Sequence, residues 1–131
     1  MTTRRSLTLV AALSVGLVLS TSTSALTWSA LDLGTFGGST LDGPATGINA
    51  SGQVVGTAFT PSAHAFITGP NGVGMTDLGT LGGSFSRATS VNAFGQVVGY
   101  ATTLNGDSHA FITGPNGVGM TDLGTLGSSS F

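Results

Sequence analysis

Short blocks of apolar and β-branched residues alternate with glycine-rich turns along most of the chain. The blocks are four to seven residues long, which is the length of short β-strands. No run after the first 25 residues has the 3.6-residue period of an amphipathic helix. The pattern therefore predicts an all-β protein with two series of four strands. In paired order these are Ala45–Asn49 and Ala88–Asn92, Gln53–Ala58 and Gln96–Thr102, His64–Thr68 and His109–Thr113, and Met75–Leu78 and Met120–Leu123.

The segments between the blocks have the composition of tight turns. Asn49–Gly52 and Asn92–Gly95 separate the first two strands of each series, and the glycine can adopt the positive φ that a hairpin demands. Gly-Pro-Asn-Gly follows the third strand at Gly69–Gly72 and Gly114–Gly117. Proline fixes φ there, while asparagine and glycine permit the reversal. Antiparallel pairing of consecutive strands is the expected result.

The two series are copies of one another. His64–Gly82 returns unchanged 45 positions later at His109–Gly127. The repeats span about residues 32–76 and 77–121, and a third begins at 122–131. Ala45–Gly56 matches its copy at an offset of 43 instead, and such length changes are tolerated in loops. The loops expected to vary are Ser39–Pro44, Thr60–Ala63, Ser84–Arg87 and Thr102–Ser108.

A repeat of about 45 residues with four antiparallel strands is typical of a β-propeller blade. Trp28–Leu33 aligns with the fourth strand of a preceding unit, so an orphan strand is expected there. Closed propellers use about four to eight blades, and two blades leave the ring incomplete. Three arrangements are then open: a ring built from several chains, an open stack of two sheets, or a truncated piece of a longer array.

The N-terminus has the three-part form of a secretory signal. Arg4 and Arg5 precede an apolar run over Leu7–Leu19, and small residues at Thr23 and Ala25 define a cleavage site before Leu26. The run is shorter than the roughly 20 residues of a membrane-spanning helix. The sequence therefore predicts a signal peptide over 1–25, a β-repeat domain over 26–131, and a secreted protein without a stable membrane span.

Charge is sparse and cysteine is absent. After signal removal one arginine faces five aspartates, a net charge of −4. Nucleic acid and anionic membranes are poor candidate partners, because both are bound through clusters of Lys and Arg. Unpaired strand edges with little charge favour self-association. An extracellular protein or a glycan remains as the expected partner.

Three short motifs recur in order in the two repeats. His-Ala-Phe occurs at His64–Phe66 and His109–Phe111, Asn49 precedes Gly52–Gly56 (Gly-Gln-Val-Val-Gly), and Met-Thr-Asp-Leu-Gly-Thr-Leu-Gly begins at Met75. These motifs resemble the HAF-repeat family of bacterial extracellular proteins. The resemblance covers about Leu31–Gly127. It implies an extracellular repeat protein and supplies no catalytic residues, although members are expected to carry many tandem units and this chain has barely more than two.

The candidate site residues are few, and a structural role is expected for most of them. His64 and His109 open identical strands without a neighbouring Cys or carboxylate, so a hydrogen bond to a turn is favoured over zinc. Asp32, Asp77 and Asp122 recur at one repeat position, where bonding to turn amides is favoured over acid-base catalysis. We expect no catalytic, cofactor or metal site.

The remaining candidates lie outside the identical segments. Asp42 and Asp107 lack the acidic cluster of a calcium loop, so turn formation is expected. Arg87 is the sole cation after the signal, and Trp28 and Tyr100 are the only large amphipathic rings. Thr57 stands where the first repeat would need the counterpart of Tyr100, so a repeated sugar site is poorly provided for.

Three functions are weighed against these residues. The first is a secreted, non-enzymatic scaffold or interaction module that presents its variable loops. The second is a carbohydrate-binding propeller assembled from two-blade subunits, in which Tyr100 or Trp28 stacks on the sugar. The third and least favoured is a hydrolase that uses the aspartates.

Overall fold

A computed structural model describes residues 29–36, 43–59 and 61–127 of the chain. The described residues from Leu31 onward form one compact unit that contains every strand named below. The expected signal peptide, Trp28, Asp42 and the last four residues of the third repeat lie outside the described residues.

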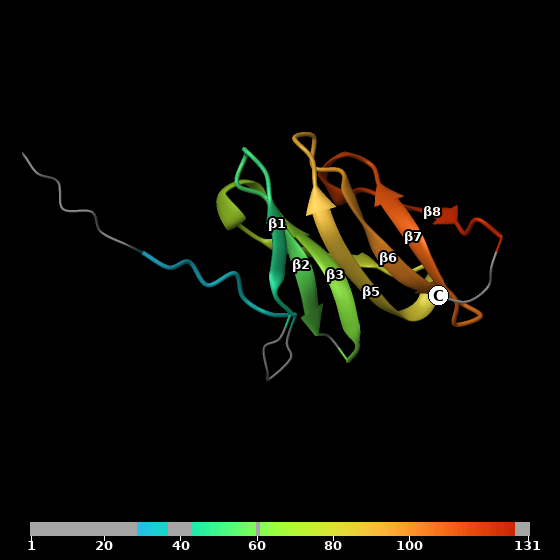
Figure 1. Ribbon diagram of the computed structural model, residues 1–131. Coiled ribbons are helices and arrows are strands. Elements are labelled where there is room, and N and C mark those ends of the chain that lie inside the picture. Colours follow the sequence, from blue (N-terminus) through green and yellow to red (C-terminus); the bar gives the residue numbers. More distant parts are fainter. Residues whose placement is uncertain (1–28, 37–42, 60, 128–131) are drawn as a thin grey trace, which may run out of the picture. The chain divides into compact units, whose positions relative to one another are not determined.

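The described residues form two four-stranded antiparallel sheets, each in sequential order (Figure 1). The predicted all-β, antiparallel four-stranded architecture is thereby confirmed. The first sheet contains β1 (Ala45–Ile48), β2 (Val54–Phe59), β3 (Ala63–Thr68) and β4 (Met75–Gly79). The second contains β5 (Gly82–Val91), β6 (Val97–Thr103), β7 (Ser108–Thr113) and β8 (Met120–Gly124).

Most strand bounds fall within one residue of the sequence expectation, and β5 is the exception. It begins at Gly82, six residues before the expected start at Ala88, and runs for ten residues. Its early half pairs with the far end of β6, where Ser86 is opposite Ala101 and Arg87 is opposite Tyr100. The expectation that Ser84–Arg87 is a loop is therefore wrong. Glycine and serine around these residues obscured a strand whose partner lies about 15 residues further along the chain.

The orphan strand expected over Trp28–Leu33 is also absent from the described part of that segment. Residues 29–36 have no strand conformation. They do not extend either edge of the first sheet, because Leu31 and Leu33 lie instead against Gly72 of the turn after β3. Side-chain contact with the turn after β3 is found where backbone pairing would have made a strand.

Both kinds of predicted turn are present. Gly52 and Gly95 have φ of 76°, and each donates its N–H to the carbonyl of the asparagine three residues earlier, at 2.9 and 3.0 Å. The Pro-Asn-Gly turns are short 3₁₀ segments, η1 (Pro70–Gly72) and η2 (Pro115–Gly117). Their asparagines have φ of 58° and 56°, a conformation that asparagine tolerates better than most side chains.

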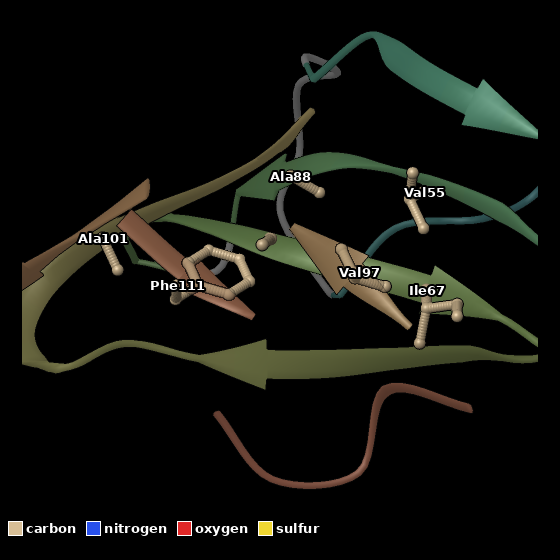
Figure 2. Packing of buried hydrophobic residues seen from close by; sticks show 7 residues of the cluster. Val55, Ile67, Ala88, Val97, Ala101 and Phe111 are labelled. Atoms are coloured by element: carbon tan, nitrogen blue, oxygen red, sulfur yellow. The ribbon is translucent and has the colours of Figure 1, made fainter. Parts of the chain in front are cut away.

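The core lies between the two sheets. Val55, Ala65 and Ile67 of the first sheet meet side chains of the second in one buried cluster. Figure 2 shows this layer, to which the second sheet contributes Ala88, Val97, Ala101 and Phe111. Each sheet thus buries one face against the other.

Consecutive antiparallel pairing divides the connections between two ends of the sheets. The β1–β2, β3–β4, β5–β6 and β7–β8 turns share one end, which we call the repeated end because their sequences recur almost unchanged. The β2–β3 connection around Pro61 and the β6–β7 turn Leu104–Asp107 lie at the opposite end, which we call the variable end. Thr102, Thr103 and Ser108, which were expected in the latter loop, belong to β6 and β7.

Candidate functional site

At the repeated end, each β1–β2-type hairpin is held by an asparagine and a glutamine. Asn49 Oδ1 accepts the backbone N–H groups of Ser51 and Gln53 at 3.1 and 3.0 Å, and Asn49 Nδ2 donates to Gln53 Oε1 at 2.8 Å. Asn92 makes the same bonds to Phe94, Gln96 and the Gln96 side chain at 2.9, 2.9 and 2.8 Å. The Asn-x-x-Gly-Gln motif is therefore a turn-forming device.

The same side chains of the first sheet also reach the second. Asn49 Nδ2 donates to the Asn92 carbonyl at 2.9 Å, and Gln53 Nε2 donates to Asn116 Oδ1 at 3.1 Å. Thr46 Oγ1 donates to the Ala88 carbonyl at 2.9 Å. These three bonds fix the two sheets with their repeated ends side by side.

Each sheet carries a histidine-aspartate pair that joins its third and fourth strands. His64 Nδ1 lies 2.8 Å from Asp77 Oδ2, and His109 Nδ1 lies 2.9 Å from Asp122 Oδ2. A carboxylate can only accept, so this geometry requires a proton on Nδ1. Sequence reasoning expected a turn as the partner of each histidine. It missed the carboxylate because the two residues are 13 positions apart and meet only through strand pairing.

The aspartates also accept from turn amides, as the sequence analysis predicted. The backbone N–H of Gly79 donates to Asp77 Oδ1 at 2.8 Å, and the N–H of Gly124 donates to Asp122 Oδ1 at 2.7 Å. Asp32 Oδ1 accepts from Gly34 at 2.8 Å in the same way. The hydrogen bond from His109, followed by that from Gly124, lowers the pKa of Asp122 below its ordinary value.

A histidine oriented by an aspartate is two thirds of a nucleophile-activating triad. Here the same pair occurs at the same place on both sheets, with each carboxylate held by its own turn. Within the described residues, no group of three or more His, Cys, Asp or Glu side chains is placed to hold a metal ion. Each pair links neighbouring strands by a hydrogen bond: His64–Asp77 joins β3 to β4, and His109–Asp122 joins β7 to β8.

The other sequence candidates are dispersed. Arg87 lies in β5 beside Tyr100 of β6, and Asp107 closes the β6–β7 turn by accepting the N–H of Thr103 on its backbone carbonyl at 2.8 Å. The Tyr100 ring is 5.7 Å from the Phe85 ring and is 38% exposed. The structure brings these aromatic rings together. Because Tyr100 is opposite Ala110 and His109 is opposite Ala101, Tyr100 and His109 lie on opposite faces of the second sheet.

Ser86 connects the two sheets by hydrogen bonds, a role that the sequence did not reveal. It is buried in β5, accepts the N–H of Ala65 at 2.8 Å, and donates to the Gly79 carbonyl. Ala65 and Gly79 are register partners at a bulge between β3 and β4. A hydroxyl from the second sheet thus completes the hydrogen bonding of the first.

Comparisons with known proteins give no match to a family model, to a curated protein or to a solved structure. Across the described residues, no helix combines the length and apolar character needed to cross a bilayer.

Proposed function

We propose that this protein is a secreted, non-enzymatic β-repeat protein that acts outside the cell as a scaffold or interaction module. Its two sheets correspond to propeller-like blades. Sequential four-stranded sheets that stack face to face, with equivalent ends together, support this description. The signal-like N-terminus and the resemblance to HAF-repeat proteins support the extracellular location.

The observation that carries the proposal is the difference in sequence between the connections at the two ends of the sheets. At the repeated end, the identical residues are occupied in turns and in bonds between sheets, as Asn49 and Gln53 illustrate. At the variable end the β2–β3 and β6–β7 connections differ: the first has Pro61 and Ser62, whereas the second has Leu104–Asp107. Gly79–Gly82 at the same end recurs as Gly124–Gly127 and belongs to the framework. Leu104 is largely exposed there. A repeated framework that displays non-repeated loops is the usual design of a binding scaffold.

A carbohydrate-binding propeller assembled from two-blade subunits is the second candidate. The exposed Tyr100 ring, supported by Phe85, favours it because sugars stack on aromatic faces. A glycan array tests this candidate: binding that is lost in Tyr100→Ala supports it, and an array without any bound glycan removes it.

Export is the first test of the favoured proposal. When the full chain is expressed in a bacterial host, we expect the protein in the medium to begin at Leu26. Retention of the intact chain inside the cell contradicts the secreted assignment.

The second test compares one exposed apolar residue at each end of the second sheet. We expect the chain to bind the surface or the secreted matrix of its host cells, and Leu104→Ser to weaken that binding about tenfold or more. Val118→Ser is the matched control, because Val118 is similarly exposed but lies in the repeated β7–β8 turn. Equal losses in both variants, or no binding by the parent chain, would overturn the assignment of the variable end as the working surface.

A further inference from the structure

Each chain presents two outer faces that are the two halves of its own internal interface. The first sheet contacts the second through the face that carries the donors Thr46, Asn49 and Gln53, which we call the donor face. The repeat gives the second sheet a copy of the donor face on its far side. The second sheet enters the same contact with the opposite face, which we call the acceptor face. The first sheet carries a copy of the acceptor face on its outward side. The exposures of matched residues identify these faces.

The far side of the second sheet is the copied donor face. Val98 is 38% exposed, whereas its counterpart Val55 is fully buried between the sheets. Leu123 is 58% exposed, whereas its counterpart Leu78 packs against the core. Ala110 and Ile112 are likewise more exposed than Ala65 and Ile67, their counterparts in the first sheet.

The polar groups of the donor face repeat the same asymmetry. Thr46, Asn49 and Gln53 each donate one hydrogen bond to the second sheet. Their counterparts are Thr89, Asn92 and Gln96. Within the described residues, the hydroxyl of Thr89 and the Asn92 amide nitrogen bond only inside their own sheet, to the Val98 carbonyl and to Gln96 Oε1, and no bond of Gln96 Nε2 is found. Thr89, Asn92 and Gln96 therefore occupy, in the second sheet, the positions from which Thr46, Asn49 and Gln53 donate across the internal interface. Thr89 would exchange its bond to the Val98 carbonyl for one to the new partner.

The outward side of the first sheet is the copied acceptor face. Its exposed part holds Ala45, Ile48 and Val54, whose counterparts Ala88, Val91 and Val97 face the core. Ala58 and Phe66, the counterparts of Ala101 and Phe111, are already buried on this side. An open, mostly apolar groove of about 770 Å³ lies on this side, lined by β1, the start of β2, η1 and Leu31 and Leu33.

Leu31 and Leu33 stand where an incoming sheet would place two of its side chains. A methyl group on Gly117 would lie 2.7 Å from Ile67 Cγ2 and 2.8 Å from Leu78 Cδ2 across the internal interface. A methyl group on the equivalent Gly72 would lie 2.9 Å from Leu33 Cδ2 and 3.1 Å from Leu31 Cδ2. The segment thus imitates part of a missing neighbouring sheet.

We propose that a second copy of this chain docks its first sheet onto the free face of the β5–β8 sheet, reproducing the internal sheet-to-sheet interface. In this contact Asn92 of one copy donates to the carbonyl of Asn49 in the other. Gln96 donates to Oδ1 of Asn71, and Thr89 donates to the carbonyl of Ala45. Ile112 and Leu123 replace Leu33 and Leu31 in the acceptor groove.

This contact is head-to-tail, because the two faces belong to different sheets. Such contacts build rings when the rotation closes and open stacks when it does not. The Tyr100 ring occupies the position of the smaller Thr57 and adds bulk on the donor face near the variable end. Across the internal interface β2 contacts β5, whose counterpart in the first sheet is β1. Docking therefore requires the Tyr100 and Phe85 rings to fit beside β1 of the incoming copy.

The inference rests on the proposed function only in treating the chain as an interaction module, and its test is separate from loop recognition. Sedimentation velocity of the purified full chain over a hundredfold concentration range is expected to show reversible assembly. The double variant Val98→Lys/Ile112→Lys is expected to weaken it at least about 100-fold, because two apolar contacts are lost and two charges are buried. Its circular dichroism is expected to be unchanged, since neither residue belongs to the core between the sheets.

Two further variants make the result specific. Leu104→Lys removes an exposed apolar residue at the variable end, and we expect it to leave assembly unchanged. Leu31→Ser/Leu33→Ser vacates the acceptor groove, and we expect it to strengthen assembly several-fold. A parent chain that stays monomeric overturns the inference and leaves extracellular binding by the loops intact. Assembly that survives the lysine double variant, or that is lost equally in Leu104→Lys, also overturns it.

Discussion

The two sheets have nearly the same sequence and yet bury different residues. Ile67 and Val55 are core residues of the first sheet, whereas Ile112 and Val98 at the same positions of the second are partly exposed. Conversely, Val97 is fully buried and its counterpart Val54 is not. A residue's contribution to stability is therefore decided by which face of its sheet has a neighbour. Identical substitutions in the two sheets should separate this effect from intrinsic strand preference.

The largest expected effect is at Phe111, which is fully buried between the sheets. Phe111→Ala removes a large side chain from the core between the sheets, and we expect the free energy of unfolding in urea to fall by about 3–5 kcal/mol. Phe94→Ala is the control, because Phe94 is exposed in the β5–β6 turn, and its effect should stay within about 0.5 kcal/mol. If Phe111→Ala prevents folding, Phe111→Leu should give a measurable intermediate loss.

Ser86 links the sheets through hydrogen bonds rather than apolar contact. Ser86→Ala leaves the N–H of Ala65 and the carbonyl of Gly79 without their bridging hydroxyl. We expect the free energy of unfolding to fall by about 1–3 kcal/mol, the range for buried unsatisfied groups. Ser84→Ala, at an exposed position of the same strand, should have little effect. Equal stability of both variants would show that water replaces the hydroxyl.

A smaller difference is expected between the two glutamines. Gln53→Ala and Gln96→Ala each lose the bond from their asparagine, but Gln53→Ala also loses the bond to Asn116 across the sheets. Gln53→Ala should therefore lower the free energy of unfolding by about 0.5–1.5 kcal/mol more than Gln96→Ala. Chemical denaturation of dilute protein measures both. A larger loss for Gln96→Ala would reverse the assignment of the interface.

The smallest effect concerns acid stability. Because His109 and Gly124 lower the pKa of Asp122, its carboxylate stabilises the folded state above the ordinary aspartate pKa of about 3.9. That contribution is lost as the pH falls through the lowered pKa of the folded state. Carboxyl NMR titration should show the Asp122 pKa rising toward its ordinary value in His109→Ala. An unchanged titration would mean that the pair does not persist in solution.

Turn chemistry explains how much of the fold the sequence predicts. Asn49–Gly52 and Gly69–Gly72 mark reversals whose residues are selected by backbone conformation, so the strands between them are bounded almost to the residue. The all-β architecture and its sequential pairing follow from those turns. The aspartate bonds to turn amides were predictable for the same reason, since both partners lie within two residues of each other.

Contacts between segments distant in sequence were not predictable in this way. The His64–Asp77 pair forms only because strand pairing brings β3 beside β4. The early start of β5 at Gly82 is set by its pairing with the far end of β6, at Thr103. Ser86 stands between Phe85 and Arg87 without any motif to mark it, and only the stacking of the sheets buries it. Leu33 was expected in a strand because it aligns with one, but its side chain lies against Gly72 of the turn after β3.

The most direct test of the account is the pair Ile67→Ala and Ile112→Ala, measured by urea unfolding at a concentration low enough to keep the chain monomeric. The substitutions are chemically identical and lie at the same position of the two sheets. Ile67 is 2% exposed within the core, so its loss should cost about 2–5 kcal/mol, and Ile112→Ala should cost at least about 1 kcal/mol less. Equal costs for the two variants in the monomer would contradict the claim that Ile67 lies on a face covered by the other sheet and Ile112 on a face without a neighbouring sheet.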